Sequence, residues 1–125
     1  MISAGCTIKG TVINSVLAPG VVIETGAVIK DSILFSDCLV GAGALIDLAI
    51  LDKNVQVGSG AVIGKGTNRH IPNQQEPTHL YTGLTLIGKG AVVPAGQVLG
   101  RNCIVTTNAK AHDYPGPELQ DGASV

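Results

Sequence analysis

Aromatic side chains are nearly absent from this sequence, whose 125 residues contain one Phe, two Tyr and no Trp. Large rings usually supply much of the buried area of a globular core. Hydrophobic residues nevertheless make up 45% of the chain, and 17 residues are glycine. The core must therefore be narrow and filled by Val, Ile, Leu and Ala, in a backbone that turns often.

The sequence also lacks an excess of charge of one sign, since eight basic and nine acidic residues leave a formal charge of -1. Neither sign forms a block, so the electrostatic pattern of proteins that bind nucleic acid or anionic membranes is missing. No apolar run reaches about 18 residues, and no charged start followed by an apolar core suggests a signal peptide. These absences predict a cytoplasmic protein that binds neither nucleic acid nor membrane.

What the sequence does contain is one 17-residue pattern written three times between Ser15 and Lys65. The three rows are SVLAPGVVIETGAVIKD (15–31), SILFSDCLVGAGALIDL (32–48) and AILDKNVQVGSGAVIGK (49–65). Within each row, a small residue is followed two places later by a large aliphatic residue, and Gly, Asp or Asn stands at the turns between such pairs. Residues two apart on a strand face the same side, so both members of each pair point inward.

This spacing predicts an all-β fold, a left-handed parallel β-helix built from hexapeptide repeats, with about five coils and one excursion loop. Apolar spacings of two and six, rather than three and four, argue against an α-helix. The chain is predicted to be a single domain, 1–125, with an irregular first coil at 1–14, regular coils at 15–63, the excursion loop at 64–83, resumed coils at 84–105 and an extended tail at 106–125. The first coil would expose an unpaired sheet edge, so we expect another part of the protein to cover it.

The cysteines fit this inward pattern and form no C-x-x-C pair. Cys38 and Cys103 each precede a valine by two places, and Cys6 precedes Ile8 in the same way. The spacing predicts that all three are buried free thiols rather than metal ligands or a redox pair.

Two histidines, His70 and His79, lie in the predicted excursion loop. A loop histidine can act as a general base in hexapeptide enzymes, but neither has a nearby carboxylate in sequence to fix its tautomer. The alternative is that both are solvated loop side chains. A zinc site made with His112 is disfavoured by the spacing, so we predict no metal site.

Five cations are predicted to project outward or to lie in the loop, namely Lys53, Lys65, Arg69, Lys89 and Arg101. They could gather around a phosphorylated small molecule or remain separate solvated charges, and their spacing does not choose between these two interpretations.

The wording of three runs is specific as well as their spacing, namely SVLAPGVVIETGAVIKDSIL, AILDKNVQVGSGAVIG and YTGLTLIGKGAVVPAGQVLGRN. These runs resemble the C-terminal β-helix domain of the ADP-glucose pyrophosphorylase family, also called glucose-1-phosphate adenylyltransferase, and the resemblance extends over nearly the whole chain. Members of that family join ATP to glucose 1-phosphate, giving ADP-glucose and pyrophosphate for glycogen or starch synthesis. Their catalysis uses Mg²⁺ in an N-terminal nucleotidyltransferase domain that opens with a G-x-G-T-R-L motif, which is absent here.

The resemblance implies a regulatory and oligomerisation domain that is not catalytic alone and holds no cofactor of its own. It also implies a homo-oligomer, contact with an N-terminal nucleotidyltransferase domain, and an effector that is a phosphorylated sugar or phosphate. Lys53 matches an activator-binding lysine of plant and cyanobacterial members, and Lys89 lies at or within one place of a second. Arg69 is the loop cation that we add to this candidate effector site.

A rival hypothesis is a trimeric hexapeptide-repeat acyltransferase that uses His70 or His79. Acyltransferases of this shape commonly continue their coils through an acyl-CoA groove, whereas the coils here are predicted to stop near Val105.

Overall fold

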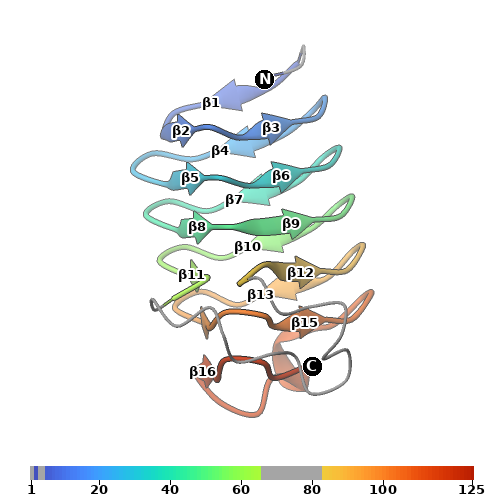
Figure 1. Cartoon of the computed structure of the whole chain (residues 1–125). Helices are drawn as coiled ribbons and strands as arrows, with labels where there is room; N and C mark the ends of the chain where they lie inside the picture. Colours follow the sequence, from blue (N-terminus) through green and yellow to red (C-terminus); the bar gives the residue numbers. More distant parts are fainter. Residues whose placement is uncertain (1, 3–4, 66–82) are drawn as a thin grey trace.

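The chain forms a three-sided column of stacked turns, which we describe from a computed structural model for residues 2, 5–65 and 83–125. Figure 1 shows the turns following one another from the N-terminus at the top to the C-terminus at the bottom. Every strand pair in the three sheets is parallel. The predicted all-β parallel solenoid of hexapeptide repeats is therefore confirmed, while its left-handed sense stays a prediction.

Each of the first five turns contributes one strand to each sheet. Sheet B contains β1 (Thr7–Ile8), β4 (Val22–Ile23), β7 (Leu39–Val40), β10 (Gln56–Val57) and β13 (Val92–Val93). Sheet C contains β2 (Thr11–Ile13), β5 (Val28–Lys30), β8 (Leu45–Asp47), β11 (Val62–Ile63), β14 (Val98–Leu99) and β16 (Glu118–Leu119). Sheet A contains β3 (Val16–Leu17), β6 (Ile33–Leu34), β9 (Ala49–Leu51), β12 (Thr85–Ile87) and β15 (Ile104–Val105).

The inward positions form continuous apolar columns, as the spacing predicts. Leu17, Leu34 and Leu51 stack on sheet A and are fully buried. Smaller residues such as Val21 and Cys38 share the interior with them. Because each layer holds one large and one small residue per side, the column keeps a constant width that aromatic rings would exceed.

A hydroxyl relay explains why one inward column begins with serine. The Ser15 hydroxyl accepts the Ser32 backbone N–H at 3.1 Å and donates to the Ile13 carbonyl at 2.8 Å. In the next turn, the Ser32 hydroxyl accepts the Ala49 N–H at 3.1 Å and donates to the Lys30 carbonyl at 2.8 Å. These bonds satisfy buried backbone groups at the corner between sheets C and A, where the strand ladder is interrupted.

The corners use residues that tolerate a positive φ angle, again as predicted. At the corner between sheets A and B, φ is +80° for Gly20, +62° for Asp37 and +61° for Asn54. The exception is Leu48, whose φ is +52° at the corner between sheets C and A. A bulky side chain is disfavoured in this conformation, so the corner at Leu48 carries local strain.

The last 20 residues differ from the extended tail predicted for 106–125. They contain a 3-10 helix, Ala111–Asp113, and β16, which pairs with β14 in register Leu99↔Leu119. The structure thus has five complete turns and a partial sixth, rather than coils that stop near Val105. Pro117 does not prevent the pairing of β16 with β14, because its carbonyl oxygen accepts the Val98 N–H at 2.9 Å and this bond needs no N–H from the proline.

The first turn is more open than those that follow. Ile8 and Ile13 are 36% and 47% exposed, and Cys6 and Val12 are only partly buried against the core. In this irregular first coil, β1 is the edge strand of sheet B and β2 is the edge strand of sheet C.

Candidate functional site

Lys53 and Lys89 occupy the same corner on consecutive turns, although the excursion loop separates them in sequence. The register pairs Leu51 with Ile87, so the residues that follow also lie one above the other. The Gly90 N–H donates to the Lys53 carbonyl at 2.9 Å, and this bond fixes the two corners directly against each other. Strands of neighbouring turns lie about 4.8 Å apart, which makes the two lysines immediate neighbours.

Both lysine side chains are exposed, and neither makes an ion pair with another residue in the described part of the chain. Like charges placed directly opposite each other on adjacent strands repel. A bound anion would relieve that repulsion, so the geometry favours an anion-binding role for this pair. The third cation predicted for the site, Arg69, lies outside the described residues, as do His70 and His79.

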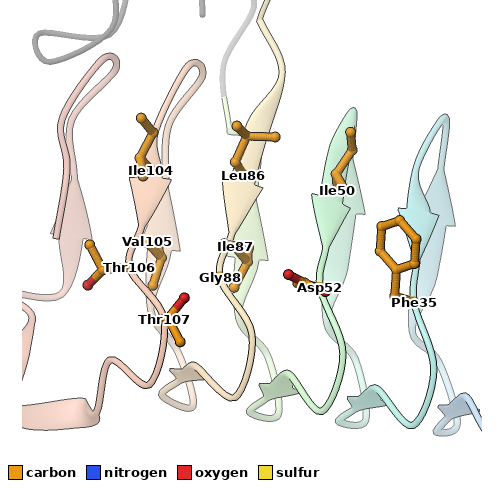
Figure 2. A pocket seen from close by; sticks show the side chains of 10 residues that line it. All are labelled: Phe35, Ile50, Asp52, Leu86, Ile87, Gly88, Ile104, Val105, Thr106 and Thr107. Atoms are coloured by element: carbon orange, nitrogen blue, oxygen red, sulfur yellow. The ribbon is translucent and has the colours of Figure 1, made fainter.

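A pocket of about 680 Å³ lies on the outer face of sheet A, directly before this corner. Figure 2 shows Ile50, Leu86 and Ile104 side by side on successive strands, and Phe35 directly after the neighbouring strand β6, in register with Asp52. Two residues further along the same chain segments stand Asp52, Gly88 and Thr106. The pocket therefore has an apolar part and a more polar margin. Lys53 and Lys89 follow Asp52 and Gly88 in the chain but do not line the pocket.

Asp52 and Gly88 shape that margin. The Lys53 backbone N–H donates to Asp52 Oδ1 at 2.7 Å, so the carboxylate is held at the corner. A side chain cannot replace the hydrogen of Gly88, because a Cβ there would lie 2.5 Å from the backbone nitrogen of Thr107. The glycine keeps the floor of the pocket free of side-chain atoms between Asp52 and Thr106.

Arg101 contradicts the prediction that it projects outward with the other cations. Only 4% of the residue is exposed, and its Nη2 lies 2.8 Å from Asp47 Oδ2. Gly64 leaves the room for this contact, since a Cβ there would be 2.2 Å from the Asp47 carbonyl oxygen and 3.3 Å from Arg101 Nη1. Arg101 follows β14 in the fifth turn, and Asp47 ends β8 in the third, so the ion pair spans the fourth turn.

This ion pair lies where the excursion loop departs from the column and returns to it. The Gly64 N–H donates to the Leu99 carbonyl at 2.9 Å, and the Gly83 N–H donates to Asn102 Oδ1 at 2.7 Å. Both ends of the loop are therefore held by the fifth turn. These contacts explain how the repeat resumes in register after the interruption.

All three cysteines are free thiols, and Cys38 and Cys103 are buried, as predicted. Cys6 is only partly buried, because it lies in the more open first turn. The Cys38 thiol donates to the Asp52 carbonyl at 3.0 Å, and the Cys103 thiol donates to the Gln120 carbonyl at 3.1 Å. Burial raises the pKa of Cys38 and of Cys103 to about 11, which keeps both thiols protonated near neutral pH.

His112 is solvent-exposed, and its Nε2 lies 3.5 Å from Asp113 Oδ1. Within residues 5–65 and 83–125, no three His, Cys, Asp or Glu side chains are grouped closely enough to bind a metal ion. No helix in the same part of the chain is long and apolar enough to cross a membrane.

The three-sided parallel column and its six-residue spacing define a hexapeptide-repeat protein. The chain belongs to the GlmU-like C-terminal hexapeptide family, whose sequence profile matches residues 1–87. It is 40% identical over 126 residues to a glucose-1-phosphate adenylyltransferase of Acetivibrio thermocellus and 46% identical over 125 residues to one of Ruminiclostridium cellulolyticum. Each match covers 100% of this chain and 29% of the relative, so the chain spans under a third of these enzymes.

These relatives confirm the family resemblance predicted from the sequence. Among solved structures, the acetyltransferase domain of PglB from Neisseria gonorrhoeae, in complex with acetyl coenzyme A, aligns with a TM-score of 0.60. The alignment covers 88% of this chain and 50% of that one at 17% sequence identity. Because the identity is so low, this likeness describes the shared fold alone.

The Arg101–Asp47 ion pair gives a stability prediction. Replacing Arg101→Met leaves the Asp47 carboxylate without its cation in a largely buried place, so we expect a loss of about 3 kcal/mol in the free energy of unfolding. The matched control is Lys65→Met, which removes an exposed cation next to Gly64 and should change the free energy by less than about 0.5 kcal/mol. Urea unfolding of both variants measures the difference, and equal midpoints would show that the ion pair does not hold the turns together.

Proposed function

We propose that this chain is the C-terminal regulatory and assembly domain of a glucose-1-phosphate adenylyltransferase. The observation that carries the proposal is the match of the entire chain to 29% of such enzymes, at 40% and 46% identity. In this proposal, ATP and Mg²⁺ are handled by an N-terminal nucleotidyltransferase domain, where ADP-glucose and pyrophosphate form. This chain contributes regulation and contacts between subunits in the cytoplasm, and it does not catalyse the reaction.

The regulatory part of the proposal is an anionic effector bound at the corner of Lys53 and Lys89. It is supported by the direct stacking of the Lys53 and Lys89 corners, by the exposure of both side chains and by the lack of an ion pair for either within the described residues. A phosphate, alone or on a sugar, offers several oxygens to such a pair. Arg69 stays a prediction as a third cation, because it lies outside the described residues.

The rival function, acyl transfer with His70 or His79 as the base, is supported by the fold shared with the PglB acetyltransferase domain. The partial sixth turn also weakens the argument that the coils end too early for an acyltransferase. The whole-chain match to adenylyltransferases at 40% identity or more favours the regulatory function. An acetyl-CoA transfer activity of the purified chain that His79→Ala abolishes would reverse this order.

We predict that Lys53→Ala and Lys89→Ala each weaken binding of fructose 1,6-bisphosphate or inorganic phosphate about tenfold, because each removes one charge-assisted hydrogen bond. The measurement is isothermal titration calorimetry on the full chain. Lys30→Ala is the control, since Lys30 is an exposed cation at the end of β5 on a different corner. If Lys30→Ala weakens binding as much as the other two, the corner of Lys53 and Lys89 is not the anion site.

The assembly part of the proposal is a homo-oligomer that also contacts the N-terminal domain. It is supported by large aliphatic side chains that face outward on all three sheets, with Ile33 39%, Leu39 42% and Leu45 42% exposed. We expect sedimentation equilibrium to give a mass of at least twice the 12.7 kDa of one chain. Replacing Ile33, Leu39 or Leu45 by Glu, one at a time, should identify the face in contact by lowering that mass. A monomer at all concentrations would contradict self-association of this chain.

A further inference from the structure

A groove of about 540 Å³ lies where the outer face of sheet B meets the corner between sheets B and C. It is separate from the lysine pair, which stands at the corner between sheets A and B. One side of the groove is formed by outward residues in register on β7, β10 and β13, namely Leu39, Gln56 and Val92. The other side is formed by corner residues of the same three turns, namely Ala42, Ser59 and Ala95.

Glycine occupies the floor between these two sides in the third and fourth turns. A Cβ on Gly41 would lie 2.6 Å from a backbone nitrogen of the next turn, and one on Gly58 would lie 2.3 Å from the corresponding atom. A residue with a side chain therefore does not fit at either position. Glu24 and Pro94 hold the same place in the second and fifth turns and stand at the two ends of the groove. At a strand spacing of about 4.8 Å, the groove is roughly 14 Å long.

The groove offers hydrogen-bonding groups of both kinds. The Glu24 carboxylate and the Gln56 side-chain amide make no hydrogen bond or ion pair within residues 5–65 and 83–125. In the same part of the chain, the backbone N–H groups of Ser59 and Ala95 have no acceptor. The carboxylate accepts hydrogen bonds, the amide both donates and accepts, and the N–H groups donate. A ligand rich in hydroxyl groups can use all of them.

The charge of the groove disfavours the anions proposed for the lysine corner. Glu24 is the one charged residue among the described residues that line it. Lys9 holds the matching place one turn before Glu24 but does not line the groove. A phosphate would meet a carboxylate here and no cation. An extended peptide fits poorly for a different reason, because β7 and β10 are paired on both sides and leave no strand edge for its backbone.

We propose that this groove binds a neutral oligosaccharide. The hydroxyl groups of the ligand hydrogen-bond to Glu24, to Gln56 and to the corner N–H groups, and the C–H faces of its rings lie against Leu39 and Val92. A sugar ring suits both surfaces, because it is polar at its rim and apolar on its faces. The groove volume of about 540 Å³ lies in the range of small-molecule sites, which combine an apolar lining with a few polar groups. The inference does not rest on the anion site, since no lysine of that corner takes part.

The test is a titration of the isotope-labelled full chain with maltotriose, a neutral chain of glucose units, followed through the backbone amide NMR signals. We expect saturable shifts of the Gly41, Ser59 and Ala95 signals and none of the Lys53 and Lys89 signals. Inorganic phosphate should leave the signals of the groove unchanged, because the groove holds a carboxylate and no cation.

Variants of the groove give the second readout. Glu24→Ala should weaken maltotriose binding about tenfold, because it removes a charge-assisted hydrogen bond, and Gln56→Ala should weaken it about fivefold. Glu118→Ala is the matched control, since Glu118 is an exposed carboxylate on sheet C and its loss should leave the affinity unchanged. Leu39→Ser should also weaken binding, whereas Leu45→Ser, at the same 42% exposure but on sheet C, should not. The amide spectrum of each variant shows at the same time whether it is folded.

The inference is overturned if maltotriose shifts no signal up to its solubility limit, or if Glu24→Ala and Glu118→Ala have equal effects. It is also overturned if phosphate shifts the groove signals, which would make the groove an anion site. The same holds if arginine amide shifts them in place of maltotriose, which would make it a cation site. None of these results bears on phosphate binding at Lys53 and Lys89, which Lys53→Ala tests separately.

Discussion

The structure depends on one constraint, which is that every turn must match the outline of the turn before it. Backbone hydrogen bonds run from one turn to the next, as from the Ala18 N–H to the Leu34 carbonyl at 2.9 Å, so a turn of different width would lose them. The inward columns of large and small residues keep that width constant. The location of an outward residue on the column is consequently fixed by its position in the repeat. Lys53 and Lys89 hold the same position in consecutive turns, so they lie together although the excursion loop separates them in sequence.

Departures from the repeat are compensated by specific contacts. Where the chain leaves the column at Gly64, the buried Arg101–Asp47 ion pair joins the third turn to the fifth. The strained φ of Leu48 lies at the same corner, directly after Asp47. The strain at Leu48 and the desolvation of the Arg101 and Asp47 charges both cost free energy. The attraction within the ion pair and the hydrogen bonds of Gly64 and Gly83 to the fifth turn act against that cost. The corner between sheets C and A thus carries most of the irregularity, while the corner with the two lysines remains regular.

The sequence predicted the solenoid because its signal is periodic and local, and the family because the wording of three long runs is specific. It also named Lys53 and Lys89, and continuing the register across the loop would have shown that they are neighbours. The outward row of Ile50, Leu86 and Ile104 was readable in the same way, since these residues stand between the inward members of their pairs. Arg101 could not be predicted, because its burial depends on Asp47, two turns away, and on the missing side chain of Gly64. Pro115 and Pro117 obscured the partial sixth turn, because they suppress the strand signal without preventing the pairing of β16.

The central claim is that the register resumes unchanged after the loop, with Lys53 directly against Lys89. The most direct measurement is disulfide formation by the Lys53→Cys, Lys89→Cys double variant in a chain whose three native cysteines are replaced by alanine. A spacing of about 4.8 Å between adjacent turns falls within the Cα separation that a disulfide allows. The account predicts that mild oxidation gives an intramolecular disulfide in this variant and none in the Lys53→Cys, Lys30→Cys control. A double variant that stays reduced, or a control that cross-links as readily, would contradict it.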